Sequence, residues 1–133
     1  MRDTNLIFNS NATISANGPS AILDMGKWAS KGVWVTLAHY GVVGGAPATA
    51  AELTAYLEYS DSATFAGQNA ARGPDIVRGQ NTAGFTRSVL CQSRRRYARI
   101  QYVVAGTTPS FTGIYAHVTS GPQRDDTAGV NTY

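Results

Sequence analysis

The residues with the greatest capacity for chemistry in this sequence are two histidines, one cysteine and eight carboxylates. His39 and His117 lie in alternating apolar segments, and neither has a nearby carboxylate or a second histidine at the spacing of a metal or general-base motif. Cys91 is the only cysteine, so the chain can form neither an internal disulfide nor a multi-cysteine metal site. We therefore expect no catalytic residues, no cofactor and no metal ligands, and we expect that the protein is not an enzyme.

The carboxylates also lack the arrangement that hydrolysis of a glycosidic bond needs. Glu58 and Asp61 are three residues apart at the end of a predicted strand, and Asp125 and Asp126 are adjacent near the C-terminus. A glycosidase holds two carboxylates at a defined distance across a cleft. Nothing in these positions indicates such a pair.

The one run of charge is Arg94-Arg95-Arg96, which is followed by Tyr97 and Arg99. Basic residues interleaved with aromatic ones can bind single-stranded nucleic acid through phosphate contacts and base stacking. They can equally be solvated or pair with acids of a neighbouring subunit, because the planar fork of arginine suits protein interfaces. A net charge of +3 gives little support to nucleic-acid binding, so a nucleic-acid partner is not expected.

Charged residues make up 14% of the chain, against about 25% in a typical soluble domain. A chain this poor in charge is expected to hide much of its surface against another molecule. Trp34 lies in a predicted strand and is expected in the core, whereas Trp28 lies in a predicted loop. An exposed tryptophan is typical of interface anchors and sugar-stacking platforms, although core or loop packing is the simpler interpretation of both.

Apolar residues alternate with period two along most of the chain, which is typical of half-buried β-strands. The predicted strands are Gly32–Tyr40, Glu52–Ser60, Arg96–Gly106 and Phe111–Ser120, with weaker ones at Ala12–Ala16, Ser20–Met25, Asp75–Gly79 and Phe85–Cys91. Turn residues between them occupy Asn17–Pro19, Val43–Pro47, Arg72–Pro74 and Gly106–Pro109, and one helical turn is predicted over residues 63–69. About eight short strands predict an all-β fold, a two-sheet antiparallel sandwich that is jelly-roll-like.

The organisation of the chain is predicted to be simple. Residues 1–120 are expected to form a single β-sandwich domain with a short N-terminal arm, and the polar, turn-rich residues 121–133 a C-terminal tail. No apolar run approaches the roughly 20 residues that cross a bilayer, and the first residues do not have the pattern of a signal peptide. We therefore expect neither membrane contact nor export.

Four segments carry a resemblance to a known family. Leu6-Ile7-Phe8 precedes a polar stretch, and Ala21–Gly26 contains an apolar-apolar-Asp-apolar-Gly pattern. Leu57–Phe65 is a strand that ends in Ser-Asp and turns through small residues to phenylalanine, and Arg95–Pro109 combines an Arg-Tyr-x-Arg strand with Gly-Thr-Thr-Pro. In this order, over most of residues 6–118, the chain resembles the jelly-roll capsid cement (decoration) proteins of certain tailed bacteriophages.

The resemblance implies a structural virion protein that binds the outside of an expanded capsid and stabilises it by bridging capsomers. Its partners would be the major capsid protein and copies of itself, in a dimer or a trimer. It would be made in the host cytoplasm and located on the capsid exterior. The residues expected to contact the capsid or sister subunits are Leu6, Phe8, Trp28, Arg94, Arg95 and Arg96.

Two other functions stay open from the sequence. One is a carbohydrate-binding β-sandwich module of a virion or tail fibre, which predicts exposed aromatic residues in a groove. The other is a single-stranded nucleic-acid binder that uses the Arg94–Arg99 strand, which predicts an affinity that falls steeply with salt.

Overall fold

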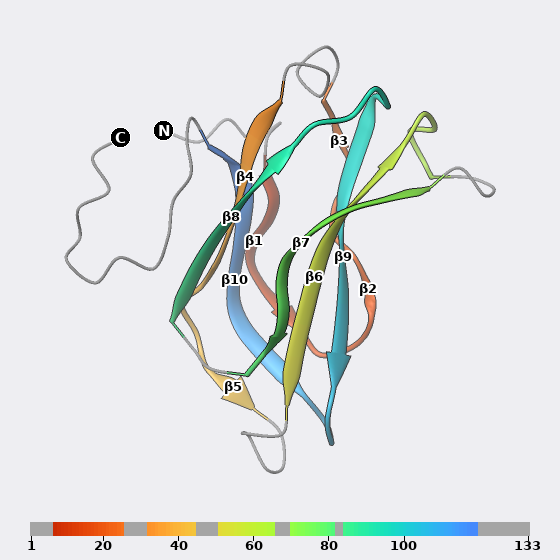
Figure 1. Ribbon diagram of the computed structural model, residues 1–133. Coiled ribbons are helices and arrows are strands. Elements are labelled where there is room, and N and C mark those ends of the chain that lie inside the picture. Colours follow the sequence, from red (N-terminus) through yellow and green to blue (C-terminus); the bar gives the residue numbers. More distant parts are fainter. Residues whose placement is uncertain (1–6, 26–31, 45–50, 66–69, 82–83, 120–133) are drawn as a thin grey trace.

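Two antiparallel sheets pack face to face in the computed structural model, which describes residues 7–25, 32–44, 51–65, 70–81 and 84–119 (Figure 1). Sheet A contains β1 (Ile7–Ile14), β10 (Ser110–Thr119), β4 (Val33–His39) and β8 (Phe85–Cys91) in this order, with β5 (Val43–Gly44) also paired to β10. Sheet B contains β2 (Gly18–Pro19), β9 (Tyr97–Ala105), β6 (Glu52–Ser60) and β7 (Ala71–Gln80), with β3 (Leu23–Asp24) also paired to β9.

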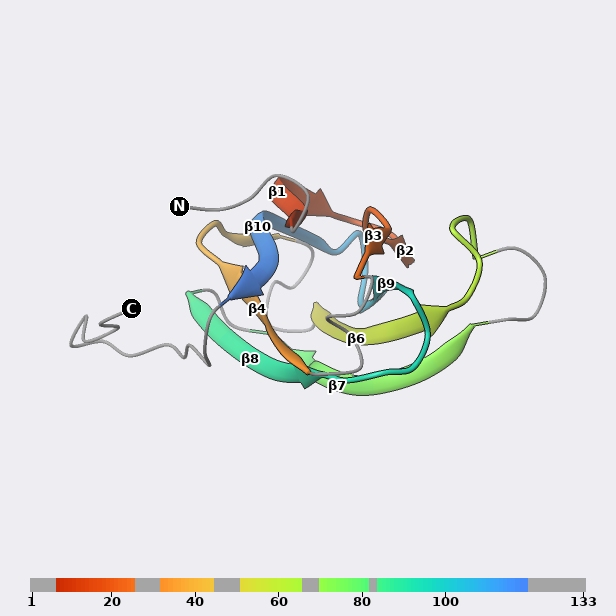
Figure 2. The same cartoon turned by 90° about the horizontal axis from the view of Figure 1, so that it is seen from above.

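The strand pairs are nested along the sequence, so that each pair encloses the next one. The pairs β1·β10 and β4·β8 lie in sheet A, and the pairs β3·β9 and β6·β7 lie in sheet B. The chain is thus a long folded hairpin whose successive pairs alternate between two sheets, which is the jelly-roll arrangement. The strands enclose the core when the molecule is seen from above (Figure 2). The predicted all-β, jelly-roll-like antiparallel sandwich is confirmed.

The alternation of side chains explains the core of sheet B. In β6, Leu53, Ala55 and Leu57 are fully buried, while the residues between them are half-buried on the other side of the sheet. Alternate residues of a strand point to opposite faces, so one register places every apolar residue of β6 against sheet A. The observed bounds of β6 are those predicted from the sequence.

The central strand β4 departs from this pattern because it is buried on both faces. Val35 and Leu37 face the core, yet Thr36 and Ala38 on the outer face are each 1% exposed. Trp34 shares that outer face and is only half-buried, so the expectation of a core tryptophan is wrong. The predicted alternation is observed in β4, but the outer neighbours of Thr36, Ser88 and Thr119, come from distant segments of the chain.

Several predicted boundaries are corrected by pairing across the sheets. The first strand is Ile7–Ile14 rather than Ala12–Ala16, because it follows β10 through three register shifts. Ser20–Met25 is not one strand; β2 and β3 pair separately with β9, and Gly18–Pro19 of the predicted turn is β2 itself.

The predicted turn Arg72–Pro74 lies inside β7, whose N-terminal half pairs with β6. Proline is tolerated there because β7 is an edge strand, where one side of the backbone needs no partner in the sheet. Residues 63 and 64 form a turn and residues 66–69 of the predicted helical turn lie outside the described ranges, within which no helix occurs.

Candidate interaction surface

Formal charge is distributed unequally between the two sheets. Among the described strands of sheet A, the one residue with a formal charge is Arg87. The described strands of sheet B contain seven, which are Asp24, Glu52, Glu58, Arg72, Asp75, Arg78 and Arg99. Within the described strands, the outer sides of the two sheets therefore differ in charge.

We define face A as the outer surface of β4, β8 and β10. It consists of uncharged side chains and one histidine: Trp34, Thr36, Ala38, Thr86, Ser88, Leu90, Tyr115, His117 and Thr119. At its centre the Thr36 hydroxyl exchanges hydrogen bonds with those of Ser88 (2.7 Å) and Thr119 (3.0 Å). This chain of hydroxyls joins three strands and satisfies a buried polar side chain.

One end of face A carries exposed apolar side chains. Tyr40 is 67% exposed and Val42 64%, and the Tyr40 ring lies 5.6 Å from that of Tyr115, centre to centre. The turn that presents them is fixed, since the Thr112 hydroxyl accepts a 2.9 Å hydrogen bond from the Val42 amide. At Gly41 an added Cβ would lie 2.3 Å from the Thr112 carbonyl oxygen, so the turn requires glycine.

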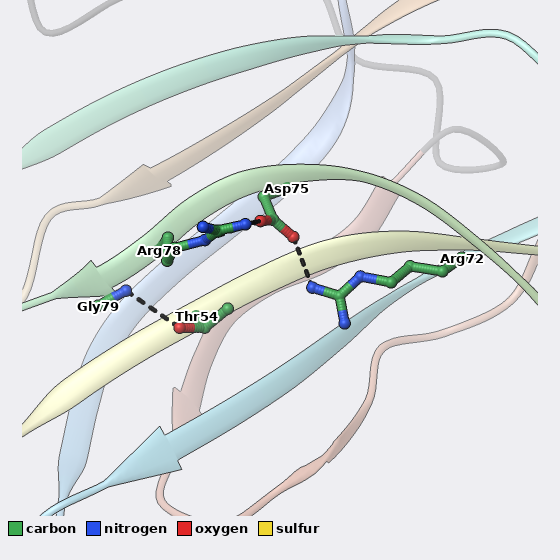
Figure 3. A network of polar contacts seen from close by, with 5 residues as sticks. All are labelled: Thr54, Arg72, Asp75, Arg78 and Gly79. Carbon is green, nitrogen blue, oxygen red and sulfur yellow. Dashed lines mark hydrogen bonds and ion pairs between the residues drawn. The ribbon is translucent and has the colours of Figure 1, made fainter.

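We define face B as the outer surface of β6, β7 and β9, where charges lie in pairs. The Asp75 carboxylate accepts hydrogen bonds from Arg72 (2.8 Å) and Arg78 (2.6 Å), while the Thr54 hydroxyl accepts one from the Gly79 amide (Figure 3). The two guanidinium hydrogen bonds hold the pKa of Asp75 below its ordinary value. The Arg72 guanidinium also stacks 3.8 Å from the centre of the Tyr56 ring.

Two further arginines on the same side have a carboxylate and an aromatic partner. Arg99 donates to Glu58 at 2.8 Å and lies 4.2 Å from the Phe65 ring centre, with both charged side chains mostly buried. Arg96 donates two hydrogen bonds to Asp24, each 2.8 Å, and these raise the pKa of the arginine. Face B and the adjoining β8–β9 turn thus neutralise much of their own charge.

The predicted contact residues are only partly on the surface. Arg94 is exposed, Arg95 is half-buried and Arg96 is exposed but paired with Asp24. Phe8 is 3% exposed in the core, so the prediction that it contacts a partner is wrong. Its β1 strand pairs with β10, which turns the side chain of the expected arm into the sandwich.

Leu6 and Trp28, the other two predicted contacts, lie outside the described residues. Face A itself was not singled out from the sequence. Charged residues are scarce in residues 33–44, 85–91 and 110–119, and this scarcity can be seen in the sequence. The sequence does not show that these segments form one surface, because only the sheet topology brings them together.

The buried ionisable groups are arranged for packing. Burial raises the pKa of the Cys91 thiol to about 11 and also raises that of the Tyr59 phenol beside it. The Tyr102 hydroxyl donates to the Asn9 side chain, a bond that joins β9 of sheet B to β1 of sheet A. The His39 ring packs against those of Phe85 and Phe111, with centre-to-centre distances of 5.4 and 5.9 Å.

The described ranges also bear on metal binding and on membrane spanning. They contain no group of three or more histidine, cysteine or carboxylate side chains placed to hold a metal ion. No helix in them has the length and apolar character to span a membrane. No family model matches the chain, and no curated protein matches it.

Proposed function

We propose that this protein is a structural virion protein that binds the outside of an expanded bacteriophage capsid and stabilises it by bridging capsomers. We further propose that it acts as a homo-oligomer and docks on the major capsid protein through face A. The observation that carries the proposal is that, among the described strands, the outer sides of β4, β8 and β10 contain no formally charged residue, whereas face B contains ion pairs. The jelly-roll fold and the family-like segments over residues 6–118 support it.

The physical reason for choosing face A is the cost of removing charges from water. Interface cores are depleted of charged residues and enriched in aromatic ones, and Trp34, Tyr115 and Leu90 give face A this composition. Docking through face B would take Arg72 and Arg78, which are 57% and 79% exposed, out of water. This desolvation is costly because their attraction to Asp75 is already present before docking. Face B is therefore the side that remains in water.

The proposed activity requires binding alone. A protein that binds the expanded shell and not its dissociated subunits stabilises the shell by mass action. Several modest contacts per oligomer reinforce one another through their high effective concentration. Exposed Arg94 in the β8–β9 turn, with Arg95 and the paired Arg96, supplies contacts for acidic groups at the rim of such an interface.

The pairing of arginines counts against binding to single-stranded nucleic acid. Arg96 and Arg99, two of the four arginines of the predicted nucleic-acid strand, already bind carboxylates. The Phe65 ring is 8% exposed and lies 4.2 Å from the Arg99 guanidinium, so it does not offer a stacking surface to a base.

A second candidate function, carbohydrate binding, is favoured by one observation. Tyr40 is 67% exposed, its ring packs on that of Tyr115, and it precedes the turn in which the Val42 amide donates to the Thr112 hydroxyl. Tyrosine rings beside polar groups can stack on sugars. Titration of the protein with host surface glycans, monitored through aromatic fluorescence, would show saturable binding that Tyr40→Ala removes.

The experiment that tests the main proposal is co-sedimentation of the purified protein with expanded and unexpanded phage heads that lack it. Saturable binding to expanded heads, together with greater resistance of those heads to heat, is the expected result. A folded protein that binds neither form would overturn the proposal and leave the carbohydrate candidate.

A further inference from the structure

The segment that enters β2 contains the one asparagine of the chain that is followed by glycine. Asn17 is exposed and directly precedes β2, which begins at Gly18. Glycine has no Cβ to hinder the approach of its backbone nitrogen to the preceding side chain. An Asn-Gly pair is therefore the sequence most prone to spontaneous loss of the side-chain amide.

This reaction uses the Asn17 side chain, the Gly18 backbone and water. The Gly18 nitrogen attacks Cγ of Asn17, and the new C–N bond closes a succinimide ring. The attacking nitrogen loses its proton, and Nδ2 of the asparagine leaves as ammonia. Water then opens the ring at either carbonyl, which gives aspartate or isoaspartate. The first step requires a Gly18 nitrogen that is free to approach Cγ.

Pairing with β9 restrains the Gly18 nitrogen. The Ser20 amide donates a 2.7 Å hydrogen bond to the Ile100 carbonyl of β9. Alternate residues of this segment, Gly18 among them, therefore direct their backbone groups toward β9. Gly18 lies opposite Tyr102 in the antiparallel register, so its N–H belongs to the sheet while β2 is paired.

The Asn17 side chain is restrained by the same strand. Its Oδ1 accepts a 2.9 Å hydrogen bond from the Val104 amide of β9. At the other end of β2, the Ser20 hydroxyl accepts a 2.8 Å hydrogen bond from the Ile100 amide, and Ser20 is 9% exposed. Both reacting groups, the side-chain amide and the Gly18 nitrogen, are therefore held against β9 as long as β2 stays in the sheet.

We propose that Asn17 is a deamidation site that the pairing of β2 with β9 keeps unreactive, and that it reacts when β2 leaves the sheet. Because β2 has two residues, its local opening costs less free energy than unfolding of the whole domain. Isoaspartate inserts an extra methylene into the main chain before Gly18 and shifts it out of register with Tyr102. The reaction thus traps the open form of β2. This inference is independent of the proposed capsid function.

The test follows deamidation of the full chain at mildly alkaline pH by peptide mass spectrometry, with aspartate and isoaspartate separated by chromatography. In guanidinium chloride, Asn17 is expected to react at least tenfold faster than in the folded protein. It is also expected to react faster there than Asn9 and Asn11, which precede serine and alanine. Equal rates at Asn17 in the folded and unfolded protein would overturn the proposal, as would an unfolded-state rate no higher than that of Asn9.

A pair of matched variants tests whether the contacts of β2 provide the protection. Ser20→Ala removes the hydroxyl that accepts from the Ile100 amide, so the folded protein is expected to deamidate severalfold faster than the wild type. Thr112→Ala removes a hydroxyl that accepts from the Val42 amide in sheet A, and it is expected to react at the wild-type rate. Equal rates in S20A and T112A would contradict protection by β2.

A third variant tests the chemistry itself. No atom lies within 4 Å of a Cβ added at Gly18, so Gly18→Ala is expected to fold like the wild type. The added methyl group hinders attack by the backbone nitrogen, and deamidation of unfolded G18A should be at least tenfold slower than that of the unfolded wild type. A G18A rate equal to the wild-type rate in guanidinium chloride would overturn the assignment of Asn17 as the reactive site.

Discussion

Faces A and B both belong to antiparallel sheets, yet different kinds of side-chain interaction connect their strands. Face A is held together by hydroxyl groups, with Thr36 bonded to Ser88 and Thr119. Face B is held together by guanidinium–carboxylate pairs, with Arg99–Glu58 the most buried of them. The hydroxyl-bonded face A and the ion-paired face B therefore belong to different sheets of the sandwich.

The comparison also locates the charge within the described part of the chain. There, most charged residues lie in the strands of sheet B and in the adjoining β8–β9 turn. Exposed ion pairs contribute little to the free energy of unfolding, about 0–1 kcal/mol each. Their main effect on face B is therefore on solubility.

The largest expected effect comes from inserting the same charge at a buried threonine of face A and at a half-buried threonine of face B. Thr36→Lys places an ammonium at a position that is 1% exposed and removes two hydroxyl contacts. The free energy of unfolding is therefore expected to fall by about 3–5 kcal/mol. Thr54→Lys, on half-buried face B, loses the bond from the Gly79 amide and is expected to lose about 1 kcal/mol. Urea denaturation measures the free energy of unfolding of both variants. Equal losses would contradict the expected difference between face A and face B.

A smaller effect is expected from removing single arginines of face B. Arg99→Met leaves Glu58, 16% exposed, without its guanidinium partner, and about 1–2 kcal/mol should be lost. Arg78→Met removes a side chain that is 79% exposed and should change the free energy of unfolding by about 0.5 kcal/mol or less. If both variants unfold at the same urea concentration, the Arg99 pair contributes no more than an exposed one.

The smallest effect is a pH dependence at Asp75. Because its folded-state pKa lies below the ordinary value of 3.8, its contribution is fully present above that value and is lost as pH falls through the lowered one. Asp75→Asn should therefore be less stable than the wild type at pH 6 and approach it below about pH 4. Thermal melts across this range provide the measurement; a difference that stays constant with pH would remove the ionic explanation.

The sequence predicted the strands whose two faces differ in polarity. The alternation of Leu53, Ala55 and Leu57 with polar neighbours located β6 to the residue, because local pattern and tertiary burial agree there. It failed where long-range pairing overrides local chemistry. Pro74 indicates a turn by itself, but pairing with β6 continues on both sides of it in β7.

The candidate surface was harder to predict than the fold. Arg94, Arg95 and Arg96 stand out as a run in the sequence, whereas face A is assembled from residues more than 80 positions apart, such as Thr36 and Thr119. Phe8 was assigned to a contact because nothing in a short N-terminal segment shows that it will pair with the last strand. The low charge of face A can be recognised only when the order of the strands in sheet A is known.

The most direct test of the central claim is co-sedimentation of two matched variants with expanded heads that lack this protein. Leu90→Glu adds a charge to face A at a residue that is 41% exposed, and Val103→Glu adds the same charge to face B at one that is 37% exposed. With both variants folded, L90E is expected to weaken head binding at least tenfold and V103E to bind like the wild type. Unchanged binding of L90E, or an equal loss in V103E, would contradict the assignment of face A as the docking surface.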